Sequence, residues 1–365
     1  MNFSYPIAPI RSFSEDELKQ IKNGAFAKVK KDGCLPQGSY LTTPFVEYVK
    51  VDGKMLLPTN HILKAAIVKK DGLTCVEPRN LKEGDEVLLG DCPCNDCGIF
   101  RDEDAFPSTK IGHGLNTVYE GSTTSYRRLF YLMKEIHERG GKIAWVLGPA
   151  VVFDYDTRLA LSELADEGYV QALLAGNAMA THDLEGGYLN TALGQNIYTQ
   201  ESVPNGHYNH LDLLNEARHF PDLKSFIVSG EVKDGFVKKM VEKDLPIVLC
   251  GSIRDDGPLP PVFSKATEGL AAMTEVLRDA DLIITLATLL HSVSAVECAP
   301  TYRVEGDQIK GTFVATIDIT DYATNSVVNE REGYLVDAIV TNVQDFCVNA
   351  RNNLIRFKDA EGRLR

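Results

Sequence analysis

The sequence predicts an α/β protein built on a parallel sheet, and three observations lead to this fold class. Two continuous apolar runs, Ile143–Leu147 and 170–174, each end in a glycine turn. A helical pattern lies between them, with apolar Leu159, Leu161, Leu164 and Ala165 on one side. Short apolar strands that alternate with helices are typical of a parallel sheet covered on both faces. Ligands of such sheets bind beyond the carboxyl ends of the strands.

The same alternation continues toward the C-terminus. Further candidate strands are 225–228, Ile247–Cys250, Leu282–Leu286 and 313–317, with helical patterns between most of them. Spacings of this length suit β-α-β units, whose crossovers are right-handed. A last helix is expected to carry Leu335, Ile339, Val343 and Phe346.

The first hundred residues have a different pattern and predict a small, β-rich domain. Ser14 precedes a short acidic stretch and is expected to cap a short helix. Asp52-Gly53 between two apolar runs is the signature of a tight hairpin. We therefore expect a β-rich domain over 1–100, a polar connection over 101–125, and an α/β domain over 126–365.

Composition and charge exclude several classes of function. The chain has 365 residues, 44% hydrophobic and 24% charged, as in ordinary soluble proteins with room for two domains. Its net charge of -13 argues against a nucleic-acid surface, which would be basic. No apolar run approaches the roughly 18 residues of a membrane helix, and the N-terminus lacks the features of a signal peptide. A cytoplasmic location is the resulting expectation.

Eight cysteines are spread through the chain, which is typical of a reduced intracellular protein. Three of them, Cys92, Cys94 and Cys97, could offer soft ligands to zinc or an iron–sulfur centre, with Cys75 or Asp96 as a fourth. The alternative is a cysteine-rich connecting loop without metal. Zinc sites typically pair two separated Cys-x-x-Cys units, and only one is present, so the spacing favours the loop. The sequence assigns no metal.

Small and polar residues gather where the predicted strands end. They are Gly148-Pro149, Gly176-Asn177-Ala178, Ser229-Gly230-Glu231, the stretch 251–257, Thr288, and 318–320. Glycines let backbone N–H groups approach a pyrophosphate, and a following helix N-terminus favours its charge. Taken singly, each glycine also fits an ordinary left-handed turn. The standard dinucleotide fingerprint Gly-x-Gly-x-x-Gly is absent.

Two histidine-containing stretches follow these turns. In 181–185, His182 with Asp183 and Glu185 offers an imidazole and two carboxylates for acid–base work. The alternative is a helix start capped by Thr181 or Asp183. In 205–210, His207 and His210 could share a helix face as metal ligands. Because no Glu-x-x-His context accompanies them, a substrate or cofactor loop is favoured.

Arg254, Asp255 and Asp256 directly follow a predicted strand. A guanidinium suits a carboxylate substrate, with which it forms paired hydrogen bonds. An aspartate suits an ammonium group, or acts as a base once its pKa is raised. The alternative is a surface turn made rigid by the prolines that follow. The position at a strand end favours a functional role.

Five segments in order resemble the NAD-dependent ornithine cyclodeaminases of archaeal type. They are LPQGSYLTTPFVEYVKVDGKML at 35–56, GPAVV at 148–152, GNAMATHDLE at 176–185, GHYNHLDLLNEAR at 206–218 and VLCGSIRDDGPLPPV at 248–262. This family also forms the C-terminal part of cyanobacterial bifunctional arginine-degrading enzymes, and was long labelled as similar to lysine-ketoglutarate reductase and saccharopine dehydrogenase. The chain departs from it at CPCNDCG, and at 205–207, where a second glycine is expected.

The resemblance implies a fold and a reaction. The NAD-binding domain of the family is similar to that of deoxyhypusine synthase. The implied reaction converts L-ornithine to L-proline and ammonia, with NAD recycled by internal hydride transfer. The implied assembly is a homo-oligomer, with neither a nucleic acid nor a membrane as partner. The alternative is an NAD-binding enzyme of different chemistry, either an amino-acid dehydrogenase or a transferase of deoxyhypusine-synthase type, acting on another amino acid or diamine. No strand end carries the lysine that imine-forming transfer needs.

The resemblance also implies roles for particular residues. Arg254 would hold the substrate carboxylate, and Asn209 and His210 would contact the substrate. Asp255 or Asp256 would hold the amine or act as the base, with His182 and Asp183 as the other proton-transfer candidates. The residues expected to meet the dinucleotide are Gly148, Pro149, Gly176, Asn177, Ala178, Gly251, Ser252, Ile253 and Asp318.

Overall fold

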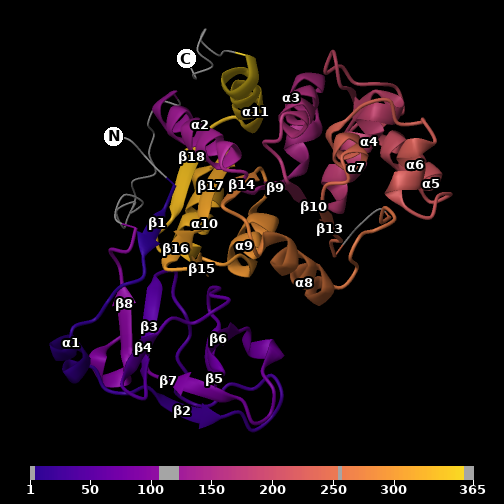
Figure 1. Ribbon diagram of the computed structural model, residues 1–365. Helices are drawn as coiled ribbons and strands as arrows, with labels where there is room; N and C mark the ends of the chain where they lie inside the picture. The colour runs from indigo at the N-terminus through magenta and orange to yellow at the C-terminus, as the bar shows by residue number, and fades with distance from the viewer. Residues whose placement is uncertain (1–4, 107–122, 254–256, 357–365) are drawn as a thin grey trace.

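The computed structural model describes residues 5–106, 123–253 and 257–356 (Figure 1). Its first part is rich in short antiparallel strands, as the sequence predicts. The elements of this part are β1 (Ile7–Pro9), α1 (Glu15–Gln20), β2 (Ala25–Lys28), β3 (Val46–Val51), β4 (Lys54–Leu56), β5 (Ala66–Lys70), β6 (Gly72–Val76), β7 (Glu86–Leu89) and β8 (Ile99–Asp102), with single turns of 3-10 helix at Pro78–Asn80 and Asn95–Cys97. They form one sheet in the order β2-β7-β5-β6 and a second in the order β4-β3-β8.

Two local predictions in this part are confirmed. Ser14 caps α1 by accepting a hydrogen bond from the backbone N–H of Glu17, and the Glu17 carboxylate accepts one from the backbone N–H of Ser14. This reciprocal pair is the capping box. Asp52 and Gly53 both have positive φ, 49° and 82°, as the tight turn between β3 and β4 requires.

The second part alternates strands and helices. Its elements are α2 (Thr123–Glu138), β9 (Ile143–Leu147), α3 (Tyr155–Asp166), β10 (Ala172–Gly176), α4 (Asn177–Leu189), β11 (Thr191–Ala192), β12 (Gln195–Asn196), α5 (Asn209–Ala217), α6 (Leu223–Val228), α7 (Phe236–Glu242), β13 (Ile247–Cys250), α8 (Ala266–Leu277), β14 (Leu282–Leu286), α9 (Leu289–Cys298), β15 (Tyr302–Glu305), β16 (Gln308–Gly311), β17 (Phe313–Asp318), α10 (Asp321–Glu330), β18 (Val336–Val340) and α11 (Val343–Arg351), with single turns at Pro149–Val152, Gly206–Tyr208 and Asn352–Arg356.

A parallel sheet of six strands organises this second part. Its strand order is β13-β10-β9-β14-β17-β18, and every neighbouring pair is parallel. Numbered along the chain, this is the order 3-2-1-4-5-6 of Rossmann domains. The order reverses between β9 and β14, and ligands of such sheets bind at that point, beyond the carboxyl ends of the strands.

Helices cover both faces of the sheet, so its strands are apolar on both sides (Figure 1). Alternate residues of β9, Ile143, Trp145 and Leu147, belong to the same buried cluster as apolar residues of α2, α3 and α11. Ala144 and Val146 face the other way, into a cluster with residues of α8, α9 and α10. The three layers explain the continuous apolar runs of the sequence.

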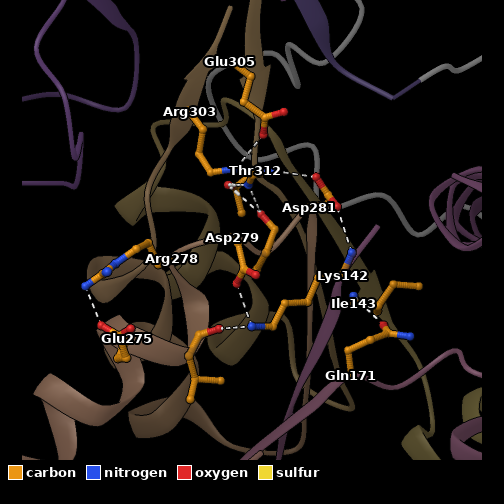
Figure 2. Close-up of polar contacts among 12 residues, drawn as sticks. Lys142, Ile143, Gln171, Glu275, Arg278, Asp279, Asp281, Arg303, Glu305 and Thr312 are labelled. Atoms are coloured by element: carbon orange, nitrogen blue, oxygen red, sulfur yellow. Dashed lines mark hydrogen bonds and ion pairs between the residues drawn. The ribbon is translucent and has the colours of Figure 1, made fainter. Parts of the chain in front are cut away.

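The amino ends of β9 and β14 are joined by Asp281. Its carboxylate accepts hydrogen bonds from the Tyr5 hydroxyl at 2.7 Å, the Lys142 backbone N–H at 2.8 Å and the Arg303 guanidinium at 2.6 Å. Figure 2 shows Asp281 with Lys142 and Arg303. Because β1 also pairs with β16, the N-terminal segment is tied to the α/β part at this end of the sheet.

Two predicted elements are wrong. The predicted strand 225–228 is the helix α6, because Asp222 caps it and Leu223, Phe226 and Ile227 bury one helical face. The predicted last helix is a strand followed by a helix: Ile339 lies in β18 and Val343 opens α11, which Asn342 caps. The hairpin of β15 and β16 was not predicted from the sequence. None of the helices in the described part of the chain is long and apolar enough to cross a bilayer.

Candidate active site

The strand-order reversal brings Gly148 against the end of β14. Its backbone N–H donates to the Leu286 carbonyl at 2.8 Å. A Cβ at this position would lie 1.8 Å from the Ala287 carbonyl oxygen. Ala287 itself has a φ of 53°, in the left-handed region. The close approach of the two strand ends therefore requires glycine at 148, and Pro149 begins a helical turn directly beyond it.

The N-terminus of α9 lies beside this crossing and adds a histidine that the sequence analysis did not single out. A Cβ on Gly176 would lie 3.0 Å from the His291 ring, so the ring packs on the first turn after β10. His291 Nδ1 lies 3.3 Å from the Thr288 hydroxyl. Burial lowers the pKa of His291, which favours the neutral imidazole. His291 could have been identified from the sequence, because it lies three residues after Thr288, which was predicted to end a strand.

Asn177 is buried at the start of α4, and its side chain holds a neighbouring loop. Its Nδ2 donates to the Gly257 carbonyl, and its Oδ1 accepts from the Leu259 backbone N–H, both at 3.0 Å. Both ends of the amide thus fix the segment that follows β13. Arg254, Asp255 and Asp256 themselves lie outside the described residues.

His182 heads a chain of hydrogen bonds across three elements. Its Nδ1 lies 2.8 Å from Glu185 Oε2, three residues further along α4. The other oxygen of Glu185 accepts from the Thr191 hydroxyl at 2.7 Å, and Thr191 Oγ1 accepts from Asn209 Nδ2 at 2.8 Å. Glu185 is completely buried, whereas the His182 ring is partly exposed. Within the described ranges, the Glu185 carboxylate is the one hydrogen-bond partner found for the His182 ring.

The helix α4 is continuous from Asn177, with Gly176 as its N-cap. The alternative that Thr181 or Asp183 caps a helix is therefore wrong. The His182 ring lies edge-on to Phe153 at 5.8 Å and 6.0 Å from the His210 ring, measured between centroids. The structure thus brings His182, Asn209 and His210 together from two distant predicted segments.

Asp183 has a different environment from its neighbour His182. Its Oδ1 pairs with Arg158 Nε at 2.8 Å, and its Oδ2 accepts from the Val237 backbone N–H at 2.7 Å. Both Asp183 and Arg158 are buried. Since the carboxylate is engaged with α3 and α7, this geometry favours a structural role over proton transfer.

The remaining predicted residues lie at strand ends along the same edge. Ala178 is exposed in the first turn of α4, and Gly251 donates its N–H to the Phe263 carbonyl. Ser252 and Ile253 are exposed after β13, and Asp318 accepts from the backbone N–H of Thr320. Asn205 has a φ of 59°, a conformation that asparagine tolerates, which explains the departure from the expected glycine.

Exposed apolar side chains gather in the loops of this edge. Ile253 follows β13, Leu290 lies in the first turn of α9, Ile319 follows β17 and Tyr322 lies in the first turn of α10. Side chains of this type are suited to the flat rings of a dinucleotide. Three features of this edge together fit a nucleotide cofactor: glycines at which the backbone can come close to a ligand, a helix N-terminus, and exposed apolar side chains.

Comparison with known proteins identifies the family. Residues 127–347 match the model of the family described as arginine dihydrolase ArgZ-like, C-terminal, Rossmann fold. The "Ornithine cyclodeaminase" of Methanococcus maripaludis is 33% identical over 297 residues, which are 78% of this chain and 70% of that protein. The chain belongs to the ArgZ-like and archaeal ornithine cyclodeaminase family.

Solved structures of the family share the fold of this chain. A conserved putative LOR/SDH protein from Methanococcus maripaludis has a TM-score of 0.79 and 29% identity, covering 91% of this chain and 98% of that one. AgrE in a ternary complex with ornithine and NAD⁺ has a TM-score of 0.58 and 26% identity, covering 92% of this chain and 48% of AgrE. The α/β fold class predicted from the sequence is confirmed, and the likeness to deoxyhypusine synthase stays a prediction.

Proposed function

We propose that this protein is an ornithine cyclodeaminase, which converts L-ornithine to L-proline and ammonia with NAD recycled in each turnover. Family membership and the 3-2-1-4-5-6 sheet support the cofactor and the reaction. The observation that carries the proposal is the hydrogen-bonded chain from His182 through Glu185 and Thr191 to Asn209, in the elements that follow β10.

The carboxyl edge of the sheet would hold NAD. Its pyrophosphate would lie beyond the ends of β9 and β14, against the turn at Gly148 and Pro149 and beside the N-terminus of α9. When bound, NAD would accept a hydride from the α-carbon of the substrate and return it to the same carbon of the cyclic imine, which gives proline. The exposed apolar side chains Ile253, Ile319 and Tyr322 would cover its rings and exclude water from the reacting carbon.

His182 would move the protons of the reaction. An ornithine amine must lose a proton before its nitrogen can take part in imine formation or attack. The imidazole Nε2 of His182 can accept that proton and later return it to the departing ammonia. Glu185, bound to Nδ1, orients the ring and stabilises its protonated form, as carboxylates do in other histidine-based sites.

Arg254 would bind the ornithine carboxylate, and Asp255 or Asp256 would bind an amine or act as a second base. These roles are implied by the family resemblance. They are supported by Asn177, which fixes the segment after them at Gly257 and Leu259, at the same edge as His182.

Separate Asp255→Asn and Asp256→Asn variants should lower turnover on the order of a hundredfold for whichever is the base, with NAD binding retained. Full activity in both variants would leave proton transfer to His182.

The direct test of the reaction is incubation of the protein with NAD and L-ornithine, followed by analysis of proline and ammonia. The proposal expects both products in equal amounts. An amino-acid dehydrogenase would instead yield an oxo acid and NADH, and that outcome would overturn the proposal.

We also propose a homo-oligomeric enzyme of the cytoplasm with three regions, 1–100, 101–125 and 126–365. Light scattering of the purified protein tests the assembly, and a single-chain mass would contradict it. Limited proteolysis tests the division, since cleavage is expected in exposed connections between domains.

A further inference from the structure

The loop between β7 and β8 carries three cysteines that take no part in the proposed reaction. Cys92, Cys94 and Cys97 come from one short stretch, and their sulfur atoms all lie within 4.8 Å of one another. The other two residues considered as ligands are elsewhere: Cys75 is buried in β6, and Asp96 pairs with Lys22 at 2.7 Å. We propose that the three thiolates and the Asp91 carboxylate form a structural zinc site.

The backbone of the loop already has the form that a metal turn needs. Cys94 to Cys97 make a single 3-10 turn, in which the backbone N–H groups of Cys97 and Ile99 both donate to the Cys94 carbonyl at 3.1 Å. Gly98 follows with a φ of 74°, and a Cβ there would lie 2.4 Å from the Gly24 nitrogen. The turn therefore requires glycine at 98, because any side chain there would clash with the backbone of Gly24. The sulfurs of Cys94 and Cys97, at the two ends of the turn, belong to the same cluster.

The sulfur spacing lies between that of a disulfide and that of a zinc site. Thiolates at 2.3 Å from a tetrahedral zinc lie about 3.8 Å apart, and the three sulfurs fall within reach of that distance. Cys92 and Cys94 sulfurs are 2.6 Å apart, longer than the roughly 2.05 Å of a disulfide bond. Rotation of the Cys92 side chain would open this pair to the zinc spacing.

The surroundings offer a carboxylate beside the three sulfurs and a balancing charge. Asp91 lies outside the group of ligand atoms that are all within 4.8 Å of one another, so its side chain would turn toward the cluster on metal binding. Asp91 Oδ1 lies 3.6 Å from the Cys97 sulfur, and a carboxylate oxygen is an accepted zinc ligand. Three thiolates and a carboxylate around Zn²⁺ carry a net charge of about -2, and the Lys22 ammonium lies next to the loop, bound to Asp96. The site would fasten the loop to the chain at Asn23 and Gly24, far from His182 in the α/β part.

Metal analysis of the tag-free, reduced protein tests this proposal. After loading with zinc and removal of the excess, we expect roughly one zinc per chain. Cobalt in place of zinc should give the visible absorption bands of a tetrahedral thiolate site. This measurement uses the unaltered protein and so does not depend on any variant. Cys94→Ser should lose the metal, whereas Cys34→Ser, which removes an exposed cysteine outside the cluster, should keep it.

Four results would overturn the site or part of it. Less than about half an equivalent of zinc, with no cobalt bands, would overturn it outright. So would stoichiometric iron, or a Cys92–Cys94 disulfide that persists in mild reductant and blocks alkylation. Unchanged zinc affinity in Asp91→Asn would remove Asp91 from the ligand set, where at least a tenfold loss is expected. Ornithine turnover is measured separately, so that failure of this site and failure of the proposed function are distinguishable.

Discussion

Glu185 is buried and accepts hydrogen bonds from two partners, one on its own helix and one on β11. It fixes His182 through Nδ1 and Asn209 through Thr191. The sequence shows the histidine and the carboxylate side by side, but it cannot show which of Asp183 and Glu185 faces the ring. Helix geometry decides this, because residues three apart share a face whereas neighbours do not.

We expect Glu185→Gln to lower kcat by on the order of a hundredfold, because the protonated form of His182 loses its anionic partner. NAD affinity should be unchanged. The matched control is Glu216→Gln, since Glu216 and His219 form an exposed pair with the same spacing on the surface. Steady-state kinetics with ornithine measure the effect, and equal kcat values for the two variants would contradict the role of Glu185.

Asp281 makes stability depend on pH. Burial raises the pKa of this carboxyl, but hydrogen bonds from Tyr5 and the Lys142 backbone, together with Arg303, outweigh burial and lower it overall. A carboxyl with a lowered pKa in the folded state stabilises the fold above its unfolded pKa of about 3.9, and that stability is lost as the pH falls through the folded value.

Asp281→Asn should therefore reduce the free energy of unfolding by about 2 kcal/mol near neutral pH. The deficit should shrink as the pH is lowered below about 4. Urea denaturation near neutral pH and below about pH 4 measures the difference in the free energy of unfolding between the variant and the unaltered protein. Asp279→Asn removes an exposed partner of Lys142 and should cost much less. A deficit for Asp281→Asn that does not change with pH would contradict this account.

At the level of elements, the crossing of β9 and β14 has a prediction of its own. Gly148→Ala would place a methyl group against the Ala287 carbonyl and push the strand ends apart. We expect NAD affinity to fall at least about tenfold, or about 1.4 kcal/mol. Gly230→Ala, where a Cβ meets nothing within 4 Å, is the control for strain at a glycine and should keep the affinity. Calorimetric titration with NAD compares the two, and equal affinities would place the cofactor elsewhere.

The long, continuous apolar strands were predicted correctly from the sequence. A short apolar run and a segment that contains both a strand and a helix were predicted wrongly. Ile143–Leu147 and Leu282–Leu286 are buried on both faces, so their apolar runs are unbroken and their bounds are as predicted. The run 225–228 is too short for its period to be read, and the Asp222 cap decides for a helix. Leu335, Ile339 and Val343 have helical spacing by coincidence, because β18 ends and α11 begins between them.

At the level of the whole molecule, the site joins segments that no sequence pattern connects. His182 and Asn209 are linked through Thr191, and Asn177 holds the loop after β13 across 80 residues. The strand ends could be predicted to share one edge, since parallel strands place them there. The hydrogen-bond partners of each side chain at that edge could not be predicted, because they depend on how α4 and α5 pack.

In the proposed reaction, hydride leaves and returns to the same carbon within one active site. The most direct measurement uses ornithine with deuterium at the α-carbon and NAD at a small fraction of the substrate concentration. The account predicts complete conversion to proline that retains the deuterium at its α-carbon, with no net formation of NADH. NADH that accumulates in step with product, or proline that has lost the deuterium, would contradict it.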